Sequence, residues 1–352
     1  MKVKPVVTAI EERAVETLLV HTGQHYDDTL SAVFLRELGI RSPDRTLAVG
    51  SGTHAEQTAR VMTAFEPLLD EWHPDVVVVV GDVNSTMACA LTAAKAGPLV
   101  AHVEAGLRSR DWSMPEEVNR VVTDRVSDYL MAPSHDAAEN LLREGYRPDQ
   151  VHLVGNVMVD TLLSNLDRAL CRPILGEIGL RPGEYGLVTV HRPANVDDDT
   201  LVGLLRALEE LAREIPLVFP VHPRTRRQLP ERPYEGLIVI DPVGYLDFVA
   251  MEASARLVLT DSGGVQEETT VLGVPCLTLR DNTERPITLT EGTNVLVGRD
   301  PDRIVGEARR VLRQGVERRC PKLWDGRAGE RVAEVIVQGR RAESQLRPTD
   351  LA

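Results

Sequence analysis

Short apolar runs alternate with amphipathic helical stretches along almost the whole chain, and this alternation limits the possible folds more than any other feature. Each run is rich in Val, Ile and Leu and is followed by a turn residue, which is typical of strands buried on both faces of a parallel sheet. Helical patterns separate the runs. The expected strands lie at 17–23, 75–82, 99–106, 129–134 and 151–156 and, after a break, at 185–193, 216–223, 237–242, 256–264 and 274–281.

Two series of this kind predict two domains, and 352 residues exceed the roughly 250–300 residues at which a single core stops growing. We therefore expect an α/β protein with two doubly wound, Rossmann-like domains that face a cleft. The break between the two series places the boundary near Thr161. The predicted units are an N-terminal domain (1–160), a C-terminal domain (161–325), and a last helix and tail (326–352) that packs back on the N-terminal domain.

The charge balance narrows the choice of partners. The chain has 53 Asp and Glu against 40 Lys and Arg, a net charge of -13, which excludes a general nucleic-acid surface but allows a small anionic ligand. We find no apolar run long enough to cross a membrane and no signal peptide, so the cytoplasm is the default location. The four cysteines form no CxxC pair, and no metal site is predicted.

Polar side chains directly follow several of the expected strands, where open α/β sheets bind their ligands. Glu104 is therefore expected to point into the cleft and not onto a solvated face. Asp82 at the tip of its strand could act as an acid or a base, whereas Asn84 is expected to cap the following helix. A lone histidine is more often structural, but the strand-end position of His191 and an adjacent arginine favour a functional role.

The stretch "TDSGGVQEETTVLG" carries the strongest local signal. Ser262, Gly263 and Gly264 lie between an expected strand and an expected helix, where backbone N–H groups and the helix dipole can hold a phosphate. The alternative is a plain helix cap with glycine in a tight turn. A second motif, "RDNTERP", follows the next strand and supplies Arg285, which favours the phosphate site.

Taken in order, "TGQH", "HVEAGLRS", "PEEVNR", "HRPANVDD", "DSGGVQEE", "GVPCLTLRDNTERP" and "EGTNVLVG" resemble the non-hydrolysing UDP-N-acetylglucosamine 2-epimerases. The match runs from near Lys2 to about Gly298, and "HVEAGLR" followed by "PEE", "DSGGVQEE" and "TERP" is specific to that family. The resemblance implies a fold similar to that of the two-domain B-type glycosyltransferases. It also implies a homodimer that contributes to polysaccharide biosynthesis.

The family interconverts UDP-N-acetylglucosamine and UDP-N-acetylmannosamine without NAD or metal. The resemblance implies that UDP leaves C1 as the C2 proton is removed, and that UDP then adds back while a proton arrives on the other face. This chemistry needs paired acid and base groups and a stabilised leaving diphosphate. By motif match, Asp82, Glu104 and Glu116 are the carboxylates around the sugar, and His191 is a candidate proton donor near the diphosphate.

The resemblance further implies a set of substrate contacts. Ser262, Gly263, Gly264 and Arg285 would hold the diphosphate, Glu268 the ribose and Phe248 the uracil; Lys2 and Arg108 complete the set. Gln24 and His25 match a second, regulatory UDP-N-acetylglucosamine site, although Asp27 stands where a second glutamine often occurs.

The start of the chain departs from the family pattern. Members usually begin with a strand and a "GTRPE" loop, whereas this chain starts inside the helix that normally follows, and only Lys2 remains of the loop. We therefore expect a gap in the N-terminal sheet and Lys2 at the cleft mouth. On this hypothesis Met1 is a mis-assigned start or a truncation, and the chain as written is nearly inactive. Two other functions stay open: a nucleotide-sugar glycosyltransferase, and an inactive protein that only binds UDP-sugars.

Overall fold

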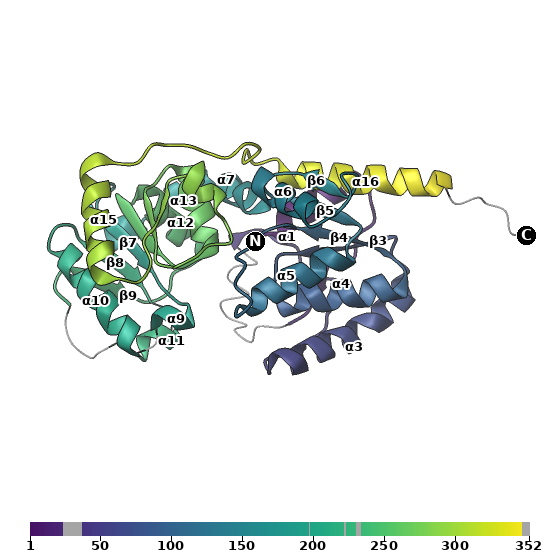
Figure 1. Cartoon of the computed structure of the whole chain (residues 1–352), viewed down its shortest axis with the longest axis horizontal. Helices are drawn as coiled ribbons and strands as arrows, with labels where there is room; N and C mark the ends of the chain where they lie inside the picture. The colour runs from purple at the N-terminus through teal and green to yellow at the C-terminus, as the bar shows by residue number, and fades with distance from the viewer. Residues whose placement is uncertain (24–36, 197, 222, 230–233, 347–352) are drawn as a thin grey trace, which may run out of the picture. The chain divides into compact units, whose positions relative to one another are not determined.

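The computed structural model describes residues 1–23, 37–196, 198–221, 223–229 and 234–346. It is an α/β structure in which every strand pair among these residues is parallel (Figure 1). The chain divides into unit 1, Met1–Thr161 with Lys322–Ala352, and unit 2, Leu162–Pro321. Each unit is described by itself below.

Unit 2 contains a six-stranded sheet of order β12-β11-β10-β7-β8-β9. The first three strands along the chain, β7 to β9, follow one another from the middle of the sheet to one edge. The last three, β10 to β12, follow one another from the middle to the other edge. This is the strand order of a doubly wound dinucleotide-binding sheet. The elements are α8 (Ile174–Glu177), β7 (Gly186–Thr189), α9 (Pro193–Val196), α10 (Asp198–Ala212), β8 (Leu217–Pro220), α11 (Pro223–Arg226), β9 (Leu237–Ile240), α12 (Tyr245–Ser254), β10 (Leu257–Thr260), α13 (Gly263–Leu272), β11 (Cys276–Thr278), α14 (Ile287–Thr290), β12 (Asn294–Leu296) and α15 (Pro301–Gln314).

Helices cover both faces of this sheet because successive strand residues point to opposite sides. In β7, Val188 packs with α10 and α15, while its neighbour Leu187 packs with α8, α12 and α13. In β10, Leu259 likewise packs with α10 and α15, whereas Val258 packs with α8, α12 and α13. The strands are therefore mainly apolar, as the sequence pattern predicts.

Unit 1 contains two separate sheets, one of order β3-β4-β5-β6 and a two-stranded one, β1-β2. The elements are α1 (Val3–Glu11), β1 (Val20–His21), β2 (Arg45–Thr46), α3 (His54–Trp72), β3 (Val76–Val80), α4 (Asn84–Ala96), β4 (Leu99–Val103), α5 (Pro115–Val126), β5 (Tyr129–Ala132), α6 (His135–Arg143), β6 (Val151–Leu153), α7 (Val157–Leu170) and α16 (Ala328–Leu346), with α7 running across the boundary into unit 2.

The larger sheet of unit 1 also has helices on both faces. Val77 and Val79 of β3 pack with α3 and α4, whereas Val76, Val78 and Val80 pack with α1 and the last helix, α16. The first and last described helices of the chain are therefore neighbours on one face of the same sheet (Figure 1).

Buried polar contacts hold α16 in this place. The Asp160 carboxylate accepts hydrogen bonds from the first N–H groups of the helix, those of Ala328 at 3.1 Å and Gly329 at 2.7 Å. The indole of Trp324, which is 5% exposed, donates to the carbonyl of Pro133 at 3.0 Å. A carboxylate at a helix N-terminus is favourable, so these contacts fix where the helix begins.

Some local predictions are wrong. The strands β2 and β12 have two and three residues and are absent from the predicted strands, because so short a run shows no recognisable pattern of apolar and polar residues. Asn84 does not cap α4: that helix has no side-chain cap. The buried Asn84 amide instead donates to Gln57 at 2.9 Å and accepts from Asn119 at 3.2 Å, so it joins three helices.

Candidate active site

Two neighbouring strands of unit 1 end side by side and bring four residues together. Val80 of β3 pairs with Val103 of β4, so the residues that follow them, Asp82 and Glu104, lie at the same edge of the sheet. Gly81, which precedes Asp82, lies beside Lys2 and Glu104, since a Cβ placed on it would be 3.3 Å from the Lys2 amine and 3.8 Å from the Glu104 carboxylate. We call Lys2, Gly81, Asp82 and Glu104 the Glu104 cluster.

Glu104 has the properties of a functional carboxylate. It is 5% exposed and has a φ of 75°, a left-handed conformation that is uncommon for a residue other than glycine and often marks a functional site. One carboxylate oxygen accepts from the Lys2 amine at 2.6 Å, and the other, Oε1, is buried with no hydrogen-bond partner in the described part of the chain. A buried charged oxygen of this kind is costly unless a ligand satisfies it.

A buried aspartate, Asp124 of α5, contacts residues on both sides of Glu104 in the sequence. Its carboxylate contacts Nδ1 of His102 at 2.6 Å and accepts from the N–H of Gly106 at 3.1 Å. It also pairs with Arg108 at 2.7 Å. Because these partners flank Glu104 in sequence, Asp124 maintains the strained turn that presents it.

The two adjacent glutamates of "PEE" have different environments. Glu117 is buried and accepts from the N–H groups of Ser109 at 2.9 Å and Arg110 at 2.8 Å, while it also pairs with Arg120. Burial raises the pKa of Glu117, but these contacts outweigh it, and its pKa lies below the usual value. Glu117 therefore holds the loop after β4. Glu116, in the first turn of α5, is half-buried, and its side chain has no polar contact among the described residues.

Asp82 and Arg108 are both held by ion pairs. Asp82 pairs with Arg120 of α5 at 2.5 Å and its side chain is 23% exposed, so it remains accessible. Arg108 is buried, and its guanidinium contacts both Asp124 and Glu144, the latter at 2.6 Å. Burial lowers the pKa of Arg108, but these carboxylates outweigh it and raise the pKa overall. The contacts give Arg108 a positioning role, and its binding of substrate stays a prediction.

In unit 2 the candidate residues lie at the carboxyl ends of β7 and β10, the neighbouring strands at which the strand order reverses. His191 follows β7, and its Nδ1 is 3.0 Å from the carboxylate of Asp261, which follows β10. Asp261 also accepts from the backbone N–H groups of His191 and Arg192 and from the Asn195 amide at 3.0 Å. This contact fixes the imidazole with Nδ1 protonated and leaves Nε2 available for a ligand, since the ring is 51% exposed.

Asp261→Asn tests this orientation. Burial raises the pKa of Asp261, but the bonds from His191, Arg192 and Asn195 outweigh it and lower the pKa. Asp261 therefore stays charged, and its stabilising contribution is lost only as the pH falls through the lowered value. We expect the variant to bind UDP but to slow any proton transfer by His191 roughly 100-fold or more. The pH–rate profile should shift with it; an unchanged profile would contradict the assignment.

The helix α13 begins directly at the glycines of "DSGG". A Cβ on Gly263 would lie 2.5 Å from Nη1 of Arg285 and 2.8 Å from a carboxylate oxygen of Glu284, so only glycine allows this arrangement. Arg285 is 5% exposed and also contacts Glu267 at 2.6 Å. An arginine beside a helix N-terminus suits a diphosphate. Ser262 and Gly264 flank this point, Ser262 as the residue before the helix.

Glu268 lies within a second buried carboxylate cluster. Its side chain accepts from the hydroxyl of Tyr245 at 2.8 Å and lies next to Glu252, which is fully buried. Burial raises the pKa of Glu268 to about 7, and burial together with the charge of Glu268 raises that of Glu252. Phe248, one turn after Tyr245, is partly buried against the same core. The ribose role of Glu268 and the uracil role of Phe248 stay predictions.

The Glu252–Glu268 pair predicts an alkaline loss of stability. A carboxyl whose pKa is raised on folding stabilises the protein while it is protonated, and this contribution is lost as the pH rises through the folded value. Glu252→Gln should therefore flatten the decline of the thermal midpoint that begins above the ordinary carboxyl pKa of 4.5 and continues as the pH rises through about 7, the pKa of Glu268. Exposed Glu317→Gln is the control and should leave the curve unchanged, because Glu317 has a lowered pKa through its pair with Arg319. Parallel curves for Glu252→Gln and the parent would contradict the prediction.

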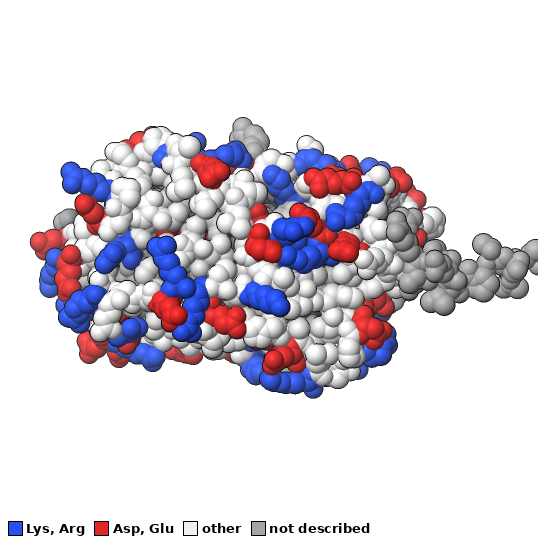
Figure 2. All heavy atoms as spheres, turned by 90° about the horizontal axis from the view of Figure 1, so that it is seen from above, with Lys and Arg blue, Asp and Glu red and all other residues white. Residues whose placement is uncertain are grey.

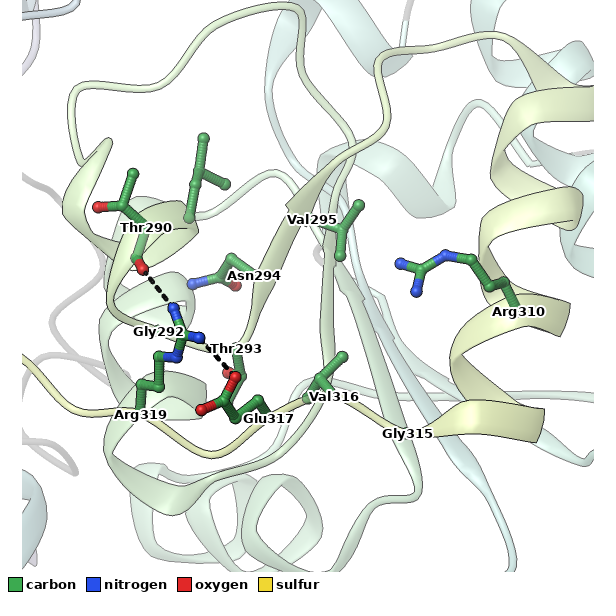
Figure 3. Close-up of a pocket in the computed structure, with 11 residues that line it drawn as sticks. Thr290, Gly292, Thr293, Asn294, Val295, Arg310, Gly315, Val316, Glu317 and Arg319 are labelled. Carbon is green, nitrogen blue, oxygen red and sulfur yellow. Dashed lines mark hydrogen bonds and ion pairs between the residues drawn. The ribbon is translucent and has the colours of Figure 1, made fainter.

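A separate cavity and the distribution of surface charge do not add residues to the candidate site. A cavity of about 310 Å³ lies at the amino end of β12, the opposite end from Ser262 and His191, and there Arg319 contacts Glu317 and the Thr290 carbonyl (Figure 3). On the face that Figure 2 shows, basic and acidic side chains are interspersed.

Gln24 and His25 lie outside the described residues. Within the described ranges there is no cluster of His, Cys, Asp and Glu suited to a metal ion, and no helix is long and apolar enough to cross a membrane.

Comparison with known proteins shows the family to which the chain belongs. The family model described as UDP-N-acetylglucosamine 2-epimerase matches residues 8–337. A UDP-N-acetylglucosamine 2-epimerase of Methanocaldococcus jannaschii is 40% identical over 97% of this chain and 96% of its own length. A UDP-2,3-diacetamido-2,3-dideoxy-D-glucuronate 2-epimerase of Pseudomonas aeruginosa is 41% identical, over 94% and 93%.

Solved structures of the same family are similar to this chain over nearly its whole length. The M. jannaschii enzyme in complex with UDP-GlcNAc and UDP superimposes with a TM-score of 0.88 over 96% of both chains, at 40% identity. The Neisseria meningitidis UDP-GlcNAc 2-epimerase bound to UDP-GlcNAc gives 0.88 over 96% of both chains, at 27% identity. The fold is that of the two-domain B-type glycosyltransferases. This chain belongs to the UDP-N-acetylglucosamine 2-epimerase family.

Proposed function

We propose that this chain interconverts UDP-N-acetylglucosamine and UDP-N-acetylmannosamine by epimerisation at C2. Membership of the epimerase family supports this activity over a glycosyltransferase or an inactive binding protein. The structural observation that carries the proposal is Glu104, a buried carboxylate with one oxygen paired to Lys2 and the other unsatisfied among the described residues. An oxygen in this state can accept the proton that leaves C2.

The reaction we propose has two steps. A carboxylate of the Glu104 cluster takes the C2 proton while the C1–O bond breaks, so that the electron pair of the C–H bond forms the C1–C2 double bond and UDP leaves with the C1–O pair. UDP then adds back at C1, and a proton arrives at C2 on the opposite face. Glu104, Asp82 and Glu116 are the candidate acids and bases.

Unit 2 would act on the leaving group. The first N–H groups of α13 and the guanidinium of Arg285 would neutralise the charge that develops on the diphosphate. His191, oriented by Asp261 at 3.0 Å, could donate a proton or a hydrogen bond to the same group. The chain then requires neither NAD nor a metal ion. A homodimer, a cytoplasmic location and a role in polysaccharide biosynthesis are further expectations from the family.

Exchange at C2 tests the proposal. UDP-N-acetylglucosamine incubated with the protein in D₂O should gain deuterium at C2 and form UDP-N-acetylmannosamine, as NMR would show. Binding of UDP without exchange would overturn the proposed activity. Turnover of UDP-2,3-diacetamido-2,3-dideoxy-D-glucuronate alone, the substrate named for the Pseudomonas relative, would overturn the proposed substrate but keep the chemistry.

A further inference from the structure

The carboxylate of Glu284 contacts three arginines of unit 2. Its Oε1 atom contacts Nη1 of Arg285 and lies 3.7 Å from Nη2 of Arg192. Its other oxygen, Oε2, lies 2.8 Å from Nη2 of Arg280. Glu284 is 3% exposed and Arg280 6%, so these charges are held away from water. We call the four residues the Glu284 cluster.

The Glu284 cluster joins two loops that flank the start of α13. Arg192 follows β7, whereas Arg280, Glu284 and Arg285 follow β11, and β10 lies between these two strands in the parallel sheet. The helix α13 begins directly after β10, at Gly263. The carboxylate therefore connects the loops on either side of this helix start.

The loop that carries Glu284 is also tied to α13 itself. The hydroxyl of Thr283 donates to the side-chain carbonyl of Gln266 at 2.7 Å and accepts from the N–H of Arg285 at 3.1 Å. A Cβ on Gly263 would lie 2.8 Å from Oε1 of Glu284. Both contacts fix the carboxylate against the first turn of the helix.

Glu284 stays charged in this position. Burial raises its pKa, but the charges of Arg285, Arg280 and Arg192 outweigh it, so the pKa of Glu284 lies well below the usual value. Guanidiniums repel one another, and the repulsion is stronger where water is excluded. A carboxylate between them offsets this repulsion, which an uncharged side chain cannot do. Glu284 thus sets the spacing of the three arginines.

A stabilising ion network is the simpler explanation of the Glu284 cluster. Buried ion pairs, however, contribute little net stability compared with apolar side chains of the same volume. The place of the cluster favours a ligand, since a helix N-terminus binds anions and arginine binds phosphate through a fixed planar fork. The side chain of Arg192 is 27% exposed, so part of the cluster can be reached from solvent.

We propose that Glu284 is a positioning residue that holds Arg285 and Arg192 at the start of α13 in the orientation that binds a diphosphate. Glu284 acts through these arginines and does not contact the substrate. The preference of the site for a nucleoside diphosphate over the nucleoside then depends on this one carboxylate. The inference rests on the proposed function, which assigns the diphosphate to the same helix start.

Glu284→Gln tests the proposal with two ligands that share uracil and ribose. UDP is titrated by calorimetry, and uridine, which lacks the diphosphate, by ligand-observed NMR. We expect the affinity for UDP to fall by about tenfold or more while that for uridine stays the same, because the loss of charge-assisted contacts concerns the diphosphate alone. The matched control is Asp281→Asn on the same loop. Asp281 pairs with Arg299 at the surface, and both affinities should remain at the parent level.

The outcomes distinguish positioning from other roles of Glu284. An equal loss of affinity for UDP and uridine would show a structural role, and a gain of UDP affinity would show that the carboxylate competes with the diphosphate; either overturns the proposal, as does unchanged UDP affinity. If Glu284→Gln fails to fold, Glu284→Asp keeps the charge but is one methylene shorter. It should lower the ratio of UDP to uridine affinity, and an unchanged ratio would overturn the proposal.

The parent protein separates this inference from the proposed function. If the parent binds UDP no more tightly than uridine, the diphosphate is not at the start of α13, and the proposed placement fails together with the role of Glu284. If the parent prefers UDP and Glu284→Gln keeps that preference, only the role of Glu284 fails.

Discussion

Glu104→Gln is expected to lower deuterium incorporation at C2 by roughly 100- to 10,000-fold, the range that general acid–base catalysis contributes. Glutamine has nearly the same shape, so it can retain the contact with Lys2 through its carbonyl oxygen, but it cannot take a proton. UDP binding, which we assign to unit 2, should change little in a calorimetric titration.

The matched control for Glu104→Gln is Glu139→Gln. Glu139 is exposed on α6 and pairs with Arg143 at 2.7 Å, a surface contact of little energetic weight. We expect exchange at C2 to stay at the parent level in this control. If Glu104→Gln loses UDP binding together with exchange, Glu104 is structural, and the base must be sought at Asp82 or Glu116.

Gly263→Ala should weaken UDP binding by a factor of about ten or more and also lower the thermal midpoint. The new methyl group would lie 2.5 Å from the Arg285 guanidinium and 2.8 Å from Glu284, so the buried pair must separate. Disrupting a buried ion pair costs about 3–5 kcal/mol. The displaced arginine would also leave the start of α13, where we expect the diphosphate.

Gly306→Ala provides the comparison. Gly306 lies inside α15 and is exposed, and a Cβ there meets no atom within 4 Å. Alanine in a helix interior is more favourable than glycine by up to about 1 kcal/mol, so this variant should be as stable as the parent or slightly more. If Gly263→Ala and Gly306→Ala bind UDP with equal affinity, the assignment of the diphosphate to the start of α13 is wrong.

The sequence predicts the parts of the site that depend on local order. Ser262, Gly263 and Gly264 stand between a strand and a helix, and Glu104 directly follows a strand, so both positions can be inferred from the pattern of apolar runs. The fold class and the family follow from the same pattern and motifs. Strands of two or three residues, such as β2 and β12, are too short to show a pattern of apolar and polar residues, so they cannot be predicted in this way.

The supporting residues cannot be found in this way. Asp124 is far from Glu104 in sequence, and only the packing of α5 on β4 brings it to the turn. Glu116 and Glu117 are neighbours in one motif, and the rotation of α5 decides that Glu117 holds the loop. A single sequence contains no signal for either distinction. For Asp261 the strand-end position was visible, but its contact with His191 depends on the pairing of β7 with β10.

The return of the last helix to unit 1 has a consequence for synthesis on the ribosome. Unit 2 is one continuous stretch, Leu162–Pro321, whereas unit 1 needs Lys322 and the residues after it. At about 5–20 residues per second, roughly 10–30 s separate the emergence of the two parts of unit 1. During this time α1 lacks its neighbour α16. The unit that is translated first is therefore completed last, and a premature stop codon near the end of the message would damage the first-made half of the protein.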